Sequence, residues 1–173
     1  GVGEKSACIV GALRGNEIQQ LYICSQLVKA LKELEAHGAI SHNHEILVIP
    51  SVTRFSMNVG KRFWPTDNSA INRAFPGDVN GDTTKQIAGT LFDRIKGYSY
   101  GIHFASFYMP GDFIPHVKMM DTGFQSASLA NLFGLQYVVI RKPKPMDTVT
   151  LNYNWQMNGT NAFSIYTNRT DDT

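Results

Sequence analysis

Residues able to do chemistry follow two short apolar runs of this chain. Arg14-Gly15-Asn16-Glu17 comes directly after the β-rich run 6–13 and forms a tight turn into an amphipathic segment. His103 lies near the end of a second such run, 100–105. Carboxylate and imidazole groups can bind a metal ion, whereas a guanidinium keeps its proton and binds anions. Because they lie where strands end, these residues are candidates for ligand contact. Residue type alone also fits a structural role: an acidic residue such as Glu17 is favoured beside a helix dipole, and a histidine in an apolar strand is more often a hydrogen-bonded core residue.

A third candidate segment lies in the long stretch 51–82, which is polar and aromatic with little periodicity. It contains Asn72-Arg73-Ala74-Phe75-Pro76-Gly77. A loop of this length inside a compact domain is usually functional or disordered. The aromatic residues around it, such as Phe63 and Phe75, favour an ordered and functional loop.

The elements that position these residues alternate between strand and helix. Apolar β-rich runs predict strands at 6–13, 45–49, 100–105, 136–140 and 162–166. Helical spacing of apolar residues predicts helices over 21–36, from Thr83 or Thr84 to Ile95, and over 124–133 and 150–157. Alternation with crossovers of this length indicates a mainly parallel sheet with helices on both faces. Ligands in such folds bind beyond the carboxyl ends of the strands.

Composition limits the classes of partner. With 173 residues and 43% hydrophobic side chains, we expect one α/β domain over 1–173. The net charge of +2 is scattered and argues against nucleic acid. No run approaches the roughly 20 apolar residues of a membrane span and no signal pattern begins the chain, so we expect no membrane partner and a cytoplasmic location. Cys8 and Cys24 are expected to be buried thiols.

The turn 14–17, the segment 72–77 and His103 together resemble the succinylglutamate desuccinylase and aspartoacylase family of the zinc carboxypeptidase superfamily. In that family the turn reads His-Gly-Asn-Glu and binds zinc, and a His after the third strand completes the metal site. A segment Asp-Leu-Asn-Arg-x-Phe-Pro-Gly holds the substrate carboxylate. The resemblance extends over about 7–168 and implies a three-layer α/β/α sandwich with a mainly parallel, mixed sheet.

Transferred residue by residue, the resemblance implies Glu17 and His103 as zinc ligands and Asn72 and Arg73 as substrate-binding groups. Arg62 lies where the family often has a second arginine. Guanidinium groups recognise carboxylates through paired, charge-assisted hydrogen bonds. The implied activity is zinc-dependent hydrolysis of an amide or ester bond in a small, N-acyl amino-acid-like carboxylate.

Three departures from the family pattern fall at chemically essential positions. Arg14 replaces the zinc-binding His, although a catalytic zinc normally holds three protein ligands and a water. Tyr166 occupies the position of the general-base Glu, and a phenol with a pKa near 10 is a poor base at neutral pH. Gly101 replaces an Asp two residues before His103. Family members also carry a further C-terminal portion, which we expect this chain to lack.

Two functions remain open on these grounds. In the first, the chain is a metal-dependent deacylase in which His116 or Asp121 supplies a third zinc ligand. In the second, zinc is lost, Arg14 pairs with Glu17 across the metal position, and the pocket binds a small carboxylate-bearing molecule together with Arg62, Asn72 and Arg73. The ligand count favours the second. A different, metal-free catalytic arrangement of Arg14 and Tyr166 is a third alternative.

Overall fold

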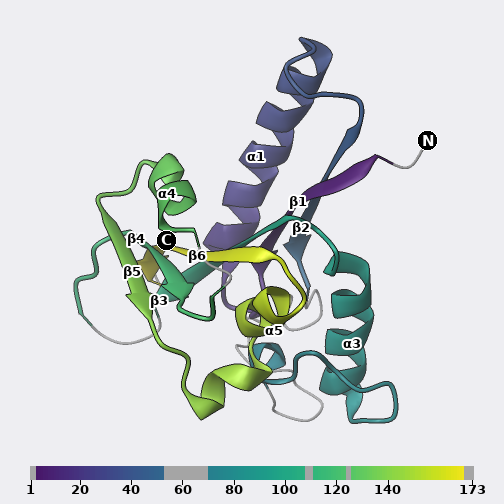
Figure 1. Cartoon of the computed structure of the whole chain (residues 1–173), viewed down its shortest axis with the longest axis vertical. Helices are drawn as coiled ribbons and strands as arrows, with labels where there is room; N and C mark the ends of the chain where they lie inside the picture. Colours follow the sequence, from purple (N-terminus) through teal and green to yellow (C-terminus); the bar gives the residue numbers. More distant parts are fainter. Residues whose placement is uncertain (1–2, 53–69, 108–110, 124–125, 170–173) are drawn as a thin grey trace.

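The computed structural model describes residues 3–52, 70–107, 111–123 and 126–169, and these form a six-stranded sheet flanked by helices (Figure 1). The strands are β1 (Glu4–Ala12), β2 (His44–Ser51), β3 (Tyr100–Phe107), β4 (His116–Met120), β5 (Tyr137–Arg141) and β6 (Asn161–Arg169). The helices are α1 (Ile18–Ala36), α3 (Thr83–Ile95), α4 (Ala127–Ala130) and α5 (Leu151–Met157). Three 3₁₀ turns are η1 (Ile71–Arg73), η2 (Asn131–Phe133) and η3 (Pro145–Val149).

The sheet is mixed but mostly parallel, with the strand order β2-β1-β3-β6-β4-β5. β1 pairs in parallel with both β2 and β3, and β3 pairs in parallel with β6. β4 pairs antiparallel with β6 and parallel with β5. The predicted fold class is confirmed, and the last strand in the sequence lies near the middle of the sheet.

Helices cover both faces of the sheet, so the fold has the predicted three layers. In Figure 1, α1 and α4 lie above the sheet and α3 and α5 below it. The larger apolar core joins the sheet to α3 and α5 and includes Val10, Phe92 and Trp155. A smaller cluster joins Val117 and Phe163 to the segment that holds α4 and η2. No helix in the described part of the chain has the length and hydropathy needed to cross a membrane.

Gly101 in β3 marks a close contact between the sheet and α5. A Cβ atom at this position would lie 2.6 Å from the nearest ring atom of Trp155, whose side chain is fully buried. Trp155 in turn donates its indole N–H to the carbonyl of Ile95 in α3 at 3.3 Å. The indole therefore occupies the space that any side chain at residue 101 would need.

β4 is an element that the sequence analysis did not predict. It has five residues, and its partners are β6, which comes much later in the chain, and β5. A strand this short is specified by its non-local neighbours more than by its own pattern. The other predicted strands and helices are present, with ends that differ by a few residues, and the predicted 124–133 helix is described as α4 followed by η2.

The segment 72–77 is anchored to the chain that leads into α5. The Asn72 side-chain carbonyl accepts a hydrogen bond from the Leu151 N–H at 3.0 Å, and the Phe75 N–H donates to the Val149 carbonyl at 3.0 Å. Phe75 is buried and makes an edge contact with Phe92. Part of this motif therefore fixes η3 and α5 relative to α3.

Both cysteine thiols are fully buried, as the sequence predicted, and both are free. Burial raises the pKa of Cys8 to about 12 and that of Cys24 to about 11. Because the thiolate is the reactive species, we expect neither cysteine to react with a disulfide reagent at pH 8 in the folded protein. In denaturant, two thiols per chain should react at once. Rapid reaction of either thiol with the reagent in the absence of denaturant would contradict this expectation.

Candidate functional site

Two rows of side chains cross the middle of the sheet on the face that α5 covers. In the first row, His103 of β3 lies beside Ser164 of β6, which lies beside Lys118 of β4. In the second row, Ala105 lies beside Tyr166 of β6, which lies beside His116 of β4. Side chains of paired residues point to the same face of a sheet. The strand register therefore brings groups that are far apart in sequence onto one surface.

A cavity of about 90 Å³ lies over these rows. It is polar and carries positive charge: among the described lining residues, the cations are Arg14, Lys118 and Arg141, and the carboxylate is Asp147. The complete lining is Arg14, Asn72, His103, Ala105, Lys118, Met119, Met120, Arg141, Asp147, Thr150, Asn152, Ser164 and Tyr166. A small cavity with three basic groups and one acidic group is suited to an anion.

Glu17 lies buried below Arg14 at the turn between β1 and α1, with 1% of its surface exposed. One carboxylate oxygen accepts the Arg14 backbone N–H at 2.9 Å, and the other accepts the Ser106 hydroxyl at 2.8 Å. The Arg14 guanidinium lies 4.0 Å from the same carboxylate. The ion pair predicted between Arg14 and Glu17 is present, and Glu17 holds the turn to the end of β3.

His103 is a buried, neutral imidazole in the cavity wall. Burial, with a smaller contribution from the charge of Arg14, lowers the pKa of His103 from its ordinary value to about 3. Its Nε2 atom is buried without a hydrogen-bond partner among the described residues, and so is the Oδ1 atom of Asn152 in the same wall. Buried polar atoms normally have a partner, so both are available to a bound molecule.

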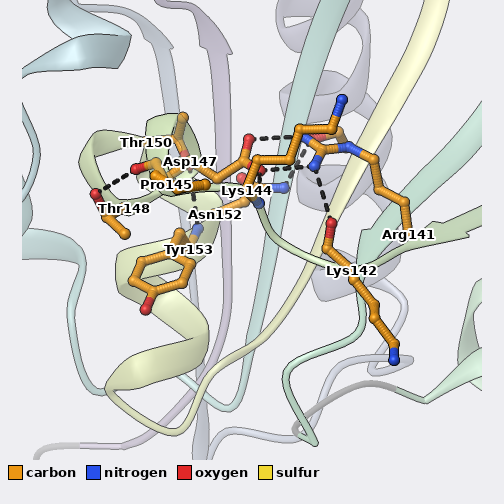
Figure 2. A network of polar contacts seen from close by, with 10 residues as sticks. Arg141, Lys142, Lys144, Pro145, Asp147, Thr148, Thr150, Asn152 and Tyr153 are labelled. Atoms are coloured by element: carbon orange, nitrogen blue, oxygen red, sulfur yellow. Dashed lines mark hydrogen bonds and ion pairs between the residues drawn. The ribbon is translucent and has the colours of Figure 1, made fainter.

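Arg141 reaches from the end of β5 to Asp147 in η3 (Figure 2). Two guanidinium nitrogens donate to the two carboxylate oxygens, each at 2.6 Å, and the Lys144 backbone N–H donates to the same carboxylate at 2.6 Å. Hydrogen bonds from Arg141 lower the pKa of Asp147. The pair is therefore charged at neutral pH and fixes the position of Arg141.

Lys118 is a half-buried cation between Arg141 and Tyr166. Its Nζ lies 5.7 Å from the centre of the Tyr166 ring. Burial, followed by repulsion from Arg141, lowers the pKa of Lys118. Its ammonium group makes no hydrogen bond or ion pair with any residue in the described ranges. Lys118 is thus a basic group that lines the cavity without a bound counterion among the described residues.

The structure brings together Arg14, Asn72, His103 and Tyr166 from the predicted site, since all four line the cavity. Arg73 is exposed in η1 and is not among the lining residues. Arg62 lies outside the described residues.

The two predicted additional ligands lie apart from the cavity lining. His116 of β4 stacks on the Tyr166 ring, with 5.1 Å between ring centres, and its Nδ1 lies 3.0 Å from the Ile114 carbonyl. Asp121 is exposed after β4, where its backbone N–H donates to the Arg141 carbonyl at 2.9 Å.

The donor set does not fit a catalytic zinc held by three protein ligands. Of the three positions that the family resemblance implies for zinc ligands, Glu17 and His103 carry donor atoms, whereas Arg14 has no lone pair to offer a metal. Both Glu17 oxygens already accept hydrogen bonds from the protein. Within the residues that the structure describes, no three His, Cys, Asp or Glu side chains are grouped so that they could hold a metal ion.

Comparison with known proteins identifies the family. The family described as "Succinylglutamate desuccinylase/Aspartoacylase catalytic domain" matches residues 4–165. The chain belongs to this family. It is therefore a member of a family of deacylases, as the resemblance of its motifs implied.

One curated protein and two solved structures illustrate what the chain is similar to, and the solved structures show the fold. The N-alpha-acetyl-L-2,4-diaminobutyric acid deacetylase of Halomonas elongata is 27% identical over 90 residues, which are 52% of this chain and 24% of that protein. An aspartoacylase family protein from Mesorhizobium loti superposes with a TM-score of 0.77 at 20% identity, covering 96% of this chain and 53% of that one. A metallo-carboxypeptidase from Burkholderia cenocepacia gives 0.70 at 12% identity, with 97% and 49% covered. This chain thus spans about half the length of the solved relatives.

The sequence analysis did not identify Lys118, Arg141, Asp147, Asn152 or Ser164 as site residues. One signal was available: Lys118 lies between the apolar residues Val117 and Met119, a pattern typical of a strand with one polar face. The position of β4 beside β6 could not be inferred from such a pattern. Without that pairing, Lys118 is an ordinary surface lysine.

Proposed function

We propose that this member of the deacylase family binds a small carboxylate-bearing molecule in the cavity above β3, β6 and β4, and that it does so without a three-ligand zinc ion. The observation that carries the proposal is the charge of the lining. Among the described lining residues, Arg14, Lys118 and Arg141 are cations and Asp147 is the carboxylate. The family resemblance implies that Arg14 replaces a zinc-binding His. Cations that are partly shielded from water stabilise an anion more strongly than fully exposed ones.

The neutral groups of the cavity support the same proposal. His103 Nε2 and Asn152 Oδ1 are buried without partners among the described residues, so they can bond to polar atoms next to the carboxylate of the bound molecule. An amide of an N-acyl amino acid offers both a donor and an acceptor there. At about 90 Å³, the described cavity accepts the acidic end of such a molecule.

Zinc binding tests this function. We expect the purified protein to take up clearly less than one zinc per chain in equilibrium dialysis, because Arg14 cannot act as a ligand. The double variant Arg14→His, Tyr166→Glu restores a three-ligand set and should bind about one zinc per chain. The single variant Tyr166→Glu serves as the control, since it keeps Arg14. Stoichiometric zinc in the unaltered protein, removed by a chelator with loss of turnover, would refute the metal-free proposal.

A zinc-dependent deacylase is the second candidate function. It is favoured by the family and by Glu17 and His103, both buried, which the resemblance implies as two of the metal ligands. For this chain it requires a third donor beyond the described cluster. Release of free amine from a panel of N-acyl amino acids, measured with and without added zinc, tests this candidate directly. Metal-stimulated turnover that Glu17→Gln abolishes would establish it.

A further inference from the structure

We propose that Lys118 and Arg141 form the anion-binding subsite of the cavity, with Asp147 as the positioning residue for Arg141. The inference rests on the proposed function. It assigns the binding of the anion to residues outside the segment 72–77. The ligand group is a compact oxyanion, either a carboxylate or a phosphate.

The register of the sheet brings the two cations together. Lys118 is paired with Val139 in parallel strands, and Arg141 is two residues beyond Val139 on β5. Residues two apart on a strand share a face, so both side chains extend over the same face as His103 and Ser164. Diagonal neighbours of this kind are within reach when their side chains are long.

Neither cation has all of its N–H donors bonded within the described ranges. Arg141 uses three N–H groups, two toward Asp147 and one toward the Lys142 carbonyl, of the five that a guanidinium carries. Lys118 has three N–H donors, and none of them bonds to a described residue. Among the described lining residues the carboxylate is Asp147, and it is already held by Arg141 and the Lys144 backbone. An anion in the cavity would therefore add hydrogen bonds without breaking existing ones.

Asp147 keeps Arg141 from moving out to solvent. The Asp147 side chain is 7% exposed and accepts hydrogen bonds from two guanidinium nitrogens of Arg141 (Figure 2). It also accepts the Lys144 backbone N–H, which holds it at η3. A preorganised guanidinium loses less conformational entropy when it binds an anion than a mobile one. The arrangement thus differs from a surface arginine that happens to lie near a cavity.

Titration of the whole chain with acetate and with inorganic phosphate, at constant ionic strength, tests the subsite. We expect Lys118→Met to weaken binding of the preferred anion at least about tenfold, as loss of a charge-assisted hydrogen bond predicts. Lys118→Arg should recover most of the affinity. Lys142→Met removes an exposed cation next to Arg141 and should leave the affinity unchanged. The ratio of acetate to phosphate affinity tells which oxyanion the subsite prefers.

A second measurement uses the unaltered protein, so it does not require that a variant folds. In the unaltered protein, saturating anion should slow acetylation of Lys118 by an amine-reactive ester several-fold, read by peptide mass spectrometry, while Lys142 and Lys144 react as before. Equal anion affinity in folded Lys118→Met, or unprotected Lys118 in the presence of bound anion, would overturn the subsite but not the proposed function. Failure of the unaltered protein to bind either anion would overturn both.

Discussion

Replacing Gly101 by aspartate, the residue type that the family resemblance implies at this position, is expected to destabilise the protein strongly. The new Cβ would lie 2.6 Å from the Trp155 ring, and the carboxylate would be buried against an apolar surface. Overpacking and an unpaired buried charge together should cost more than about 4 kcal/mol, a large part of the stability of a typical domain. Thermal unfolding followed by circular dichroism measures the loss.

A double-mutant cycle separates the clash from other effects of residue 101. Gly101→Ala should destabilise the protein strongly when Trp155 is present, and much less in a Trp155→Leu background, where the ring is gone. The coupling free energy between the two positions should exceed about 1 kcal/mol. Additive effects of the two substitutions would show that the ring is not the cause.

Replacing Asp147 by asparagine should lower the free energy of unfolding by about 2–3 kcal/mol, because it leaves Arg141 partly buried without its counterion. Hydrogen bonds from Arg141 depress the pKa of Asp147 below its ordinary value of 3.8. For a depressed carboxyl pKa, the stabilisation is complete above the unfolded value and is lost as the pH falls through the folded value. The difference between the two proteins should therefore be constant near neutral pH and shrink below about pH 4.

Asp93→Asn is the matched control for this measurement. Asp93 pairs with Lys96 at 2.6 Å, but the two side chains are 67% and 50% exposed. Exposed pairs contribute little, so the control should change stability by less than about 1 kcal/mol. If the two variants unfold alike in denaturant titrations, the Arg141–Asp147 pair does not have the structural role described above.

Most of the fold could be predicted from local patterns in the sequence. Helices such as α3 have helical spacing and a capping residue, here Asp82, whose side chain accepts the Lys85 N–H at 2.9 Å. Buried parallel strands such as β1 are continuous apolar runs. β4 was not predicted because it is short and pairs with β6, which is distant in sequence. Its strand conformation therefore depends on pairing with neighbouring strands more than on its own residues.

The family motifs predicted only part of the site, since Glu17 and Arg73, although motif residues, are not among the lining residues. Arg14, Asn72, His103 and Tyr166 were found from motif positions, and all four line the cavity. Lys118 and Arg141 were not found, since their relation to His103 is set by strand order and register. The role of Gly101 could not be predicted from the sequence either. The ring that excludes a side chain at this position belongs to Trp155, which lies 54 residues later in the chain.

β6 supplies the middle residue of both rows of side chains under the cavity, Ser164 and Tyr166. Binding in the cavity therefore requires that this last strand has already folded into the sheet. A slip of β6 by one residue would turn Ser164 and Tyr166 to the opposite face and separate His103 from Lys118. The binding surface therefore does not exist in any intermediate that lacks the correctly docked last strand. An anion that binds there selects the fully assembled chain and raises its population at the expense of partly folded forms.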